Sequence, residues 1–170
     1  RLRRDFAVLP PGDIRACMVA LSQDEALLSR MFQYRFKEGR GLKGHSFGNL
    51  FLTALTDITG DFAHAVRLAS EVLASRGEII PSTAANVVLE AQLADGRVIK
   101  GESNISKSRS PIDTLRILPA SPQPFRESLE AIRDADLITL GPGSLFTSVI
   151  PNLLIRSIPR EIMRASGVRA

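Results

Sequence analysis

The sequence predicts an α/β fold, in which helices surround a sheet that is partly parallel and partly antiparallel. Apolar residues recur at helical spacing in two adjacent stretches, residues 46–58 and 61–73, which predicts a pair of packed helices. Residues 87–93 alternate between apolar and polar and are followed by the turn Asp95-Gly96, which predicts an antiparallel hairpin. An apolar stretch at 137–140 then runs into a glycine turn ahead of another helix, as strands do in α/β proteins.

The composition is that of an ordinary globular protein. The chain has 170 residues, of which 44% are hydrophobic and 24% charged. This is enough for one domain with a core, and it excludes disorder, collagen and a coiled coil as descriptions of the whole chain. No stretch approaches the roughly 18 apolar residues that span a bilayer, and no signal sequence is evident. We therefore expect a soluble, cytoplasmic protein.

Charge and aromatic content argue against nucleic-acid binding. The net charge is +4, but it comes from the first five residues and from residues 153–170, and the middle of the chain is slightly negative. There is no tryptophan and one tyrosine for base stacking. The single cysteine, Cys17, excludes a disulfide framework and a cysteine metal site, and its apolar neighbours predict a buried, inert thiol.

Four helices are expected in the first half of the chain. Asp13 caps a helix that ends near residue 21, and residues 25–32 form a second, short one. Residues 35–43, with two glycines and four cations, are expected to form a flexible loop. Ser46 opens the clearest helix, which Gly60 ends, and Asp61 caps the next, which ends before Gly77. The predicted buried face of the Ser46 helix comprises Phe47, Leu50, Phe51, Ala54, Leu55 and Ile58.

Strands dominate the middle of the chain. We expect short strands at residues 78–81 and 115–118, beside the hairpin of residues 87–93 and 97–101. Residues 101–111 are polar and are expected to be a mobile connection. A helix over residues 125–134, a strand at 137–140 and helical residues to about 165 complete the chain.

The glycine turn after residue 140 is the first candidate site. Gly141 and Gly143 allow the backbone to approach a ligand closely, and the start of the following helix favours an anion. Hydroxyl donors there are supplied by Ser144, Thr147 and Ser148. The stretch fits neither the dinucleotide fingerprint nor the Walker loop, so an ordinary turn capped by Ser144 stays open as the alternative.

A second candidate site precedes the clearest helix. Lys43-Gly44-His45-Ser46 is a polar glycine turn, and the helix start behind it also suits an anion. His45 and Asn49 could contact a ligand, although a lone histidine is more often a capping or surface residue and Asn49 could merely complete the helix cap.

Taken together, four separated motifs resemble the YvcK/CofD-like family over essentially the whole chain. They are Pro10-Pro11-Gly12-Asp13-Ile14-Arg15, Gly44-His45-Ser46-Phe47-Gly48-Asn49, Gly101-Glu102-Ser103 and the stretch from Gly141 through Pro151-Asn152. The resemblance is strongest to the gluconeogenesis factor branch. It implies a single partial nucleotide-binding domain over residues 1–170 with a Rossmann-like three-layer fold, a mostly parallel sheet and an antiparallel hairpin. It also implies that a glycine-rich strand and loop before residue 1 and a C-terminal part are missing here.

The resemblance implies a nucleotide-diphosphate cleft. The Gly141 loop, with Asn152 nearby, would bind the diphosphate of a UDP-sugar, and His45, Ser46 and Asn49 would approach from the other side. Arg15 could pair with phosphate, or it could be an ordinary surface arginine. No residue is assigned a catalytic or metal-binding role.

Three functions follow as hypotheses. The first is a nonenzymatic UDP-sugar-binding regulator that supports cell shape during gluconeogenic growth, with a protein partner and a homo-oligomer left open. The second is a magnesium-dependent 2-phospho-L-lactate transferase that acts on a deazaflavin in coenzyme F420 synthesis. The hydroxyl-rich rather than acidic surroundings of the glycine loop favour the regulator, because transferase chemistry needs a carboxylate to orient metal or acceptor. The third is an interaction module that has lost its ligand.

Overall fold

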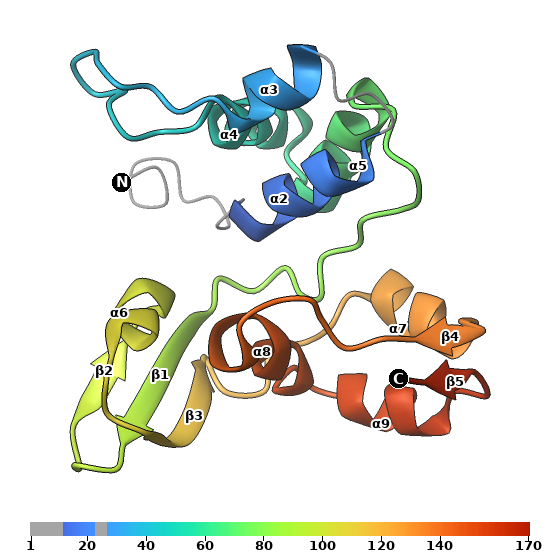
Figure 1. Cartoon of the computed structure of the whole chain (residues 1–170). Helices are drawn as coiled ribbons and strands as arrows, with labels where there is room; N and C mark the ends of the chain where they lie inside the picture. The colour runs from blue at the N-terminus through green and yellow to red at the C-terminus, as the bar shows by residue number, and fades with distance from the viewer. Residues whose placement is uncertain (1–11, 23–26) are drawn as a thin grey trace. The chain divides into compact units, whose positions relative to one another are not determined.

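A computed structural model describes residues 12–22 and 27–170 of the chain. Its contacts divide the protein into two compact units, Arg1–Pro81 and Ser82–Ala170, and each has its own hydrophobic core (Figure 1). The single domain expected over residues 1–170 stays a prediction.

The first unit is helical, as the sequence predicts. Its described residues form α2 (Gly12–Leu21), α3 (Leu27–Gln33), α4 (Phe47–Thr59) and α5 (Phe62–Val72). The predicted start of the second helix, at residue 25, lies outside the described residues. The helices at 46–58 and 61–73 are confirmed to within a residue or two at each end.

Local capping chemistry fixes the ends of α4 and α5. The Ser46 hydroxyl accepts a hydrogen bond from the Asn49 backbone N–H (3.3 Å), and Gly60 ends α4 in the left-handed conformation at φ +67°. Asp61 starts the next helix one residue later, because its carboxylate accepts from the His64 backbone N–H (2.6 Å). These bonds satisfy donors that a helix start leaves unpaired, so the predicted helical hairpin is confirmed.

The buried face of α4 differs from the predicted one by a rotation of one residue. Leu52, which was not expected in the core, is fully buried, whereas Ile58 is 78% exposed. Phe47, Phe51 and Leu55 of the predicted face do pack against the core. Apolar residues cover a broad arc of α4, so helical spacing alone does not select between two neighbouring faces. Packing against α3 and α5 makes the choice. The core that results comprises Met18, Phe32, Leu52, Val66, Ala69, Leu73 and Ile79.

Cys17 is exposed, so the prediction of a buried thiol is wrong. The neighbouring Met18 occupies the core position of α2 instead and has no exposed surface. Partial burial raises the pKa of the Cys17 thiol, and the negative charge of Asp13 one turn earlier adds to the rise. The thiol form is therefore favoured near neutral pH, which is typical of a poorly reactive cysteine.

The second unit contains a three-stranded antiparallel sheet. Its strands are β1 (Val88–Leu93), β2 (Val98–Lys100) and β3 (Ile112–Leu118), in the order β2-β1-β3. Alternation in β1 buries Ala91 and Leu93 and exposes Gln92 between them, which confirms the predicted hairpin. Residues 78–81, in contrast, form no strand, because they pair with no other strand of the described chain.

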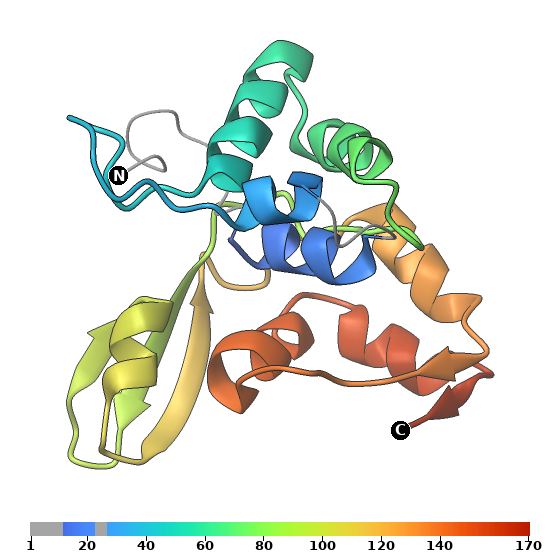
Figure 2. The ribbon, with the colours of Figure 1, turned by 45° about the horizontal axis from the view of Figure 1, so that its top comes forward.

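Helix α6 (Glu102–Lys107) occupies the segment that was expected to be a mobile connection. It contains one buried apolar residue, Ile105, which is too little for a helical repeat to be visible in the sequence. Gly101 precedes it at φ +87°, and α6 lies against β1 and β2, as both views show (Figures 1 and 2). The prediction for this segment is therefore corrected to a short ordered helix.

The remaining elements are short. A two-residue parallel pair, β4 (Leu137–Ile138) with β5 (Val168–Arg169), is joined through helical segments. These are the π-helical turn η1 (Leu145–Val149), α8 (Ile150–Leu153) and α9 (Ile158–Arg164), while α7 (Arg126–Arg133) precedes β4. The protein is thus α/β, but the larger sheet of the described residues is antiparallel rather than parallel. The Rossmann-like three-layer arrangement stays a prediction. Across the described ranges, no helix has the length and apolar character needed to cross a membrane.

Candidate functional site

The turn after β4 has the backbone that the sequence predicts for a ligand loop. Gly141 lies at φ +121° and Gly143 at φ +148°, conformations that side chains rarely allow. A Cβ atom built on Gly143 would lie 2.8 Å from Cβ and 3.2 Å from Oγ of Ser148. Glycine is therefore required at residue 143 for two reasons. Its φ angle is one that other residues rarely adopt, and Ser148 occupies the space that a side chain would need.

The segment behind this loop is a π-helical turn, not the ordinary helix start that was expected. Helix η1 begins with the hydrogen bond from Val149 N–H to the Ser144 carbonyl (3.1 Å), and only the four-residue α8 follows it. Isolated π turns are rare in proteins, and those that occur are often located at functional sites. The Ser144 hydroxyl makes no capping bond, so the alternative of a turn capped by Ser144 is not what forms.

The predicted hydroxyl donors differ in accessibility. Ser144 is exposed and Ser148 is half-buried, whereas Thr147 is buried, with 7% of its surface exposed. The structure therefore brings Gly141, Gly143, Ser144 and Ser148 together on one short loop. Thr147 packs beneath it, and its role as a ligand donor stays a prediction.

Asn152 anchors the loop. Its Nδ2 donates to the Ser148 carbonyl (2.8 Å), and its Oδ1 accepts from the Ser82 hydroxyl (2.6 Å). Both ends of the amide are thus occupied, which suits a residue that positions the loop. Ser82 was not singled out in the sequence, and no motif marks it, because its partner lies 70 residues away along the chain.

The second predicted group surrounds the start of α4 in the first unit. Ser46 is 1% exposed, and its hydroxyl caps the helix by accepting from the Asn49 N–H, so Ser46 has a structural role here. Two hydrogen bonds fix the backbone of His45. Its carbonyl oxygen accepts from the Phe36 N–H, and its own N–H donates to the Leu42 carbonyl (2.9 Å each). These bonds tie the cationic loop of residues 35–43 to the helix start.

Arg15 joins this second group across Gly48. A Cβ built on Gly48 would lie 2.9 Å from Cγ and from Cδ of Arg15, so the arginine stem runs directly over the first turn of α4. Arg15 Nε and Asn49 Oδ1 are buried without a hydrogen-bond partner in the described chain. A buried unpaired donor or acceptor costs about 1–3 kcal/mol. The two atoms therefore mark a place where the protein leaves polar groups unsatisfied.

Each group is thus assembled within its own unit. Arg15, Ser46 and Asn49, with His45 before them, belong to the first, and the Gly141 loop with Asn152 belongs to the second. The prediction that the groups face one ligand stays a prediction. Across the described ranges, no three His, Cys, Asp or Glu side chains gather where they could hold a metal ion.

Two pockets are lined by residues other than the predicted site residues. One of about 280 Å³ is at the end of α5, where the buried Ser75 hydroxyl has no partner in the described chain. The other, of about 370 Å³, lies between the β1–β2 hairpin and α6, and three cations line it.

Comparison with known proteins places the chain. A family model described as 2-phospho-L-lactate transferase CofD matches residues 1–169, across both units. The chain belongs to the CofD family. A protein of Nostoc sp. is 53% identical over 169 residues, which cover 99% of this chain and 37% of that protein. The gluconeogenesis factor of Bacillus subtilis is 48% identical over 165 residues, covering 97% of this chain and 52% of the relative.

A solved structure has the same fold. An X-ray crystal structure of a Bacillus halodurans protein superposes with a TM-score of 0.94 at 46% identity, covering 99% of this chain and 54% of the other. The chain spans about half the length of that structure and of the Bacillus subtilis relative. The resemblance to this family, and to its gluconeogenesis factors in particular, is confirmed.

Proposed function

We propose that the protein is part of a gluconeogenesis factor, a nonenzymatic regulator that binds a UDP-sugar and supports cell shape during growth on gluconeogenic carbon sources. Relatives that are 46–48% identical over nearly the whole chain bear the name gluconeogenesis factor. The Rossmann-like fold, a cytoplasmic location and a protein partner belong to the same proposal. The chain spans about half the length of the Bacillus subtilis relative, and in this proposal the regions that the relative has in addition complete the ligand site.

The Gly141–Ser148 loop is the observation that carries the proposal. Gly141 and Gly143 keep side chains away from the backbone, and the exposed Ser144 hydroxyl makes no hydrogen bond within the described chain. The first N–H groups of a helical turn have no partner inside the turn. Uncovered N–H and O–H donors on a glycine loop are the groups that bind the oxygens of a diphosphate.

The hydroxyl and amide chemistry of this loop supports a binding role over a transferase role. A transferase must stabilise charge that develops during transfer, which calls for a placed acid, base or metal ligand. Residues 141–152 contain no Asp, Glu, Lys or Arg. The loop is therefore suited to holding a diphosphate, and relatives that are 46–48% identical carry the name gluconeogenesis factor.

Calorimetric titration of the full-length protein with UDP-N-acetylglucosamine tests the proposal. We expect saturable binding, which Ser144→Ala weakens by roughly tenfold or more, because one hydrogen bond to a charged group is worth about 1.5–3 kcal/mol. Ser166→Ala is the matched control, since Ser166 is an exposed serine outside the loop.

Three results would contradict the proposal or replace it. Absence of saturable binding would show that the protein does not bind this UDP-sugar. Equal affinity of the Ser144 and Ser166 variants would show that the loop is not part of the binding site. Transfer of a phospholactyl group to a deazaflavin acceptor by the full-length protein would establish the transferase instead.

A further inference from the structure

The pocket between the β1–β2 hairpin and α6 combines a cavity with unpaired positive charge. None of the residues that line it belongs to the Gly141–Ser148 loop, although α6 itself contacts η1 of that loop. Its volume is about 370 Å³, near the lower end of the roughly 300–1,000 Å³ typical of small-molecule sites. It is lined by Leu93, Arg97, Ile99, Asn104, Lys107, Ser108 and Arg109.

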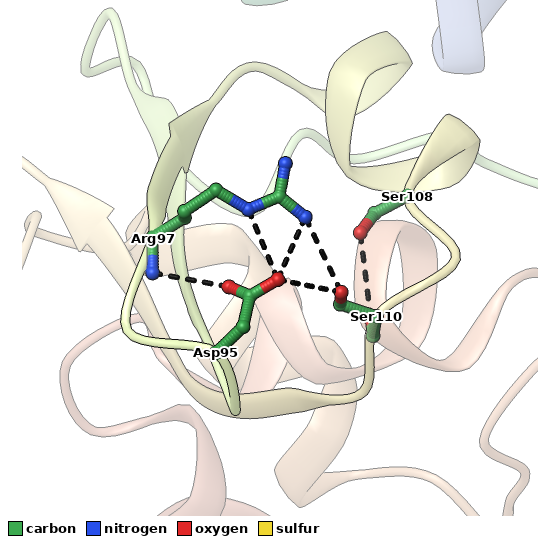
Figure 3. A network of polar contacts seen from close by, with 4 residues as sticks. All are labelled: Asp95, Arg97, Ser108 and Ser110. Carbon is green, nitrogen blue, oxygen red and sulfur yellow. Dashed lines mark hydrogen bonds and ion pairs between the residues drawn. The ribbon is translucent and has the colours of Figure 1, made fainter.

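Arg97 is oriented at one side of this pocket by an ion pair with Asp95 at the protein surface. Its Nε and Nη2 both donate to Asp95 Oδ2, at 3.0 and 2.7 Å, and Nη2 also donates to the Ser110 hydroxyl at 3.3 Å. Ser110 in turn donates to Asp95 (2.7 Å), as Figure 3 shows. The pKa of Asp95 is held well below its usual range, first by Arg97 and then by Ser110, so the carboxylate stays charged. The guanidinium is thereby fixed before any ligand arrives.

This network leaves one face of Arg97 available. Nη1 makes no hydrogen bond to any residue that the structure describes, and in Figure 3 it points away from Asp95 and Ser110. A guanidinium anchored on one edge presents its remaining N–H groups in a fixed direction, which lowers the entropic cost of binding. Arg97 can therefore serve as a preorganised donor.

Lys107 and Arg109 supply the excess charge. Both are exposed and belong to no ion pair within residues 12–22 and 27–170. Because Asp95 neutralises Arg97, these two residues leave the pocket with a net charge of about +2. That charge matches a dianion, and a phosphate monoester carries about −1.5 to −2 near neutral pH.

The apolar part of the lining indicates that the ligand has a carbon skeleton. Leu93 and Ile99 face the same pocket as the three cations, and no aromatic residue lines it. Nucleic-acid sites pair positive charge with aromatic side chains on which bases stack, which this pocket lacks. A small phosphorylated metabolite satisfies both the cations and the apolar wall.

We propose that the pocket formed by Arg97, Lys107 and Arg109 is a binding site for a small phosphate monoester, with Ile99 contacting its carbon skeleton. The site stands independently of the proposed UDP-sugar function. Its residues come from the β1–β2 hairpin and from α6 with the residues after it.

Isothermal titration of the full-length protein with glycerol phosphate, at fixed ionic strength, tests the site. We expect saturable binding that the double variant Lys107→Gln/Arg109→Gln weakens by at least about tenfold, the factor that one charge-assisted hydrogen bond supplies. Neither side chain makes a hydrogen bond in the described structure, so the variant should fold, which circular dichroism verifies. Arg116→Gln/Arg156→Gln removes the same charge from exposed positions outside the pocket and should leave the affinity within about twofold.

The outcomes separate this site from other phosphate sites on the protein. Absence of saturable binding, or binding that persists in the Lys107/Arg109 variant, would overturn the proposal, because a phosphate on the Gly141 loop would not depend on these cations. An equal loss in the control variant would also overturn it, by showing a response to net charge alone. Equal affinity for inorganic phosphate would overturn the contact between Ile99 and a carbon skeleton.

Discussion

Replacing Gly48 with alanine gives a sharp test of how the first unit packs, because helix propensity and the observed packing predict opposite signs. In an ordinary helix interior, alanine is favoured over glycine by about 1 kcal/mol. At Gly48, however, an added Cβ would lie 2.8 Å from the Phe32 carbonyl oxygen and 2.9 Å from Cγ and Cδ of Arg15. Native Cβ atoms essentially never approach other atoms within 3.0 Å. Something must therefore move when the methyl group is added.

The cost depends on which neighbour can move. The Arg15 stem is flexible, but the Phe32 carbonyl belongs to the backbone of α3. The Phe32 ring also packs edge-on against the rings of Phe47 and Phe51, with ring centroids 5.9 and 5.1 Å apart. Overpacking a well-filled core costs about 1–3 kcal/mol, and a fixed carbonyl places this site toward the upper end. Gly48 lies in the first turn of α4, so its gain in propensity is at most the interior value of about 1 kcal/mol. After subtracting that gain, we expect Gly48→Ala to lower the free energy of unfolding by about 1–2 kcal/mol.

Urea unfolding of the full-length protein, followed by circular dichroism, measures this difference. Gly12→Ala is the matched control: Gly12 also lies in a helix, and no atom of the described residues lies within 4 Å of a Cβ built on it. The control should be neutral or stabilising by up to about 1 kcal/mol. Adding Arg15→Ala to Gly48→Ala should recover only part of the loss, since the carbonyl contact remains. A Gly48→Ala protein at least as stable as the Gly12→Ala control would refute the reasoning.

Two further predictions concern titratable groups. Arg97 and Ser110 lower the pKa of Asp95, so its contribution to stability is fully present above the unfolded value near 4 and is lost as pH falls below it. The carboxyl carbon of Asp95 in ¹³C NMR should thus titrate well below pH 4, and a midpoint near 4 would contradict the network of Figure 3. The pKa of Cys17 is raised, so its alkylation rate by iodoacetamide should reach half of its maximum above pH 9.0, the ordinary thiol value, and Asp13→Asn should lower that midpoint. A half-maximal rate at or below pH 9.0 would show a normal or lowered thiol pKa.

Helix ends in the first unit were predictable because capping is local chemistry. Ser46, Gly60 and Asp61 each act through atoms within four residues, which a reader of the sequence can recognise. The buried face of α4 was not predictable in the same way, since Leu52 and Ile58 are equally apolar and only neighbouring helices distinguish them. Cys17 and Met18 illustrate the same limit, because adjacent apolar positions compete for one core site.

The second unit shows where local pattern carries less information. The β1–β2 hairpin was readable, since alternation and Asp95-Gly96 are short-range signals. Helix α6 was not, because Ile105 is its single buried residue. At the candidate site, the sequence indicated the two glycines of the loop. The π-helical form of η1 and the bond from Ser82 to Asn152 depend on packing and on a contact across 70 residues, which no spacing reveals.

Two of the four family motifs contain glycines that are required for different physical reasons, and this decides how variants should be interpreted. Gly48 is needed because Arg15 and the Phe32 carbonyl occupy the space of a side chain, so its replacement disturbs the core of the first unit. Gly143 lies at φ +148° with Ser148 against it, so replacing it with valine would distort the loop whether or not a ligand binds there. Loss of nucleotide affinity in a Gly143 variant would therefore not identify a ligand contact. Ser144→Ala removes a hydroxyl that makes no hydrogen bond within the described chain, and it adds neither atoms nor strain. This variant therefore tests ligand binding by the loop directly.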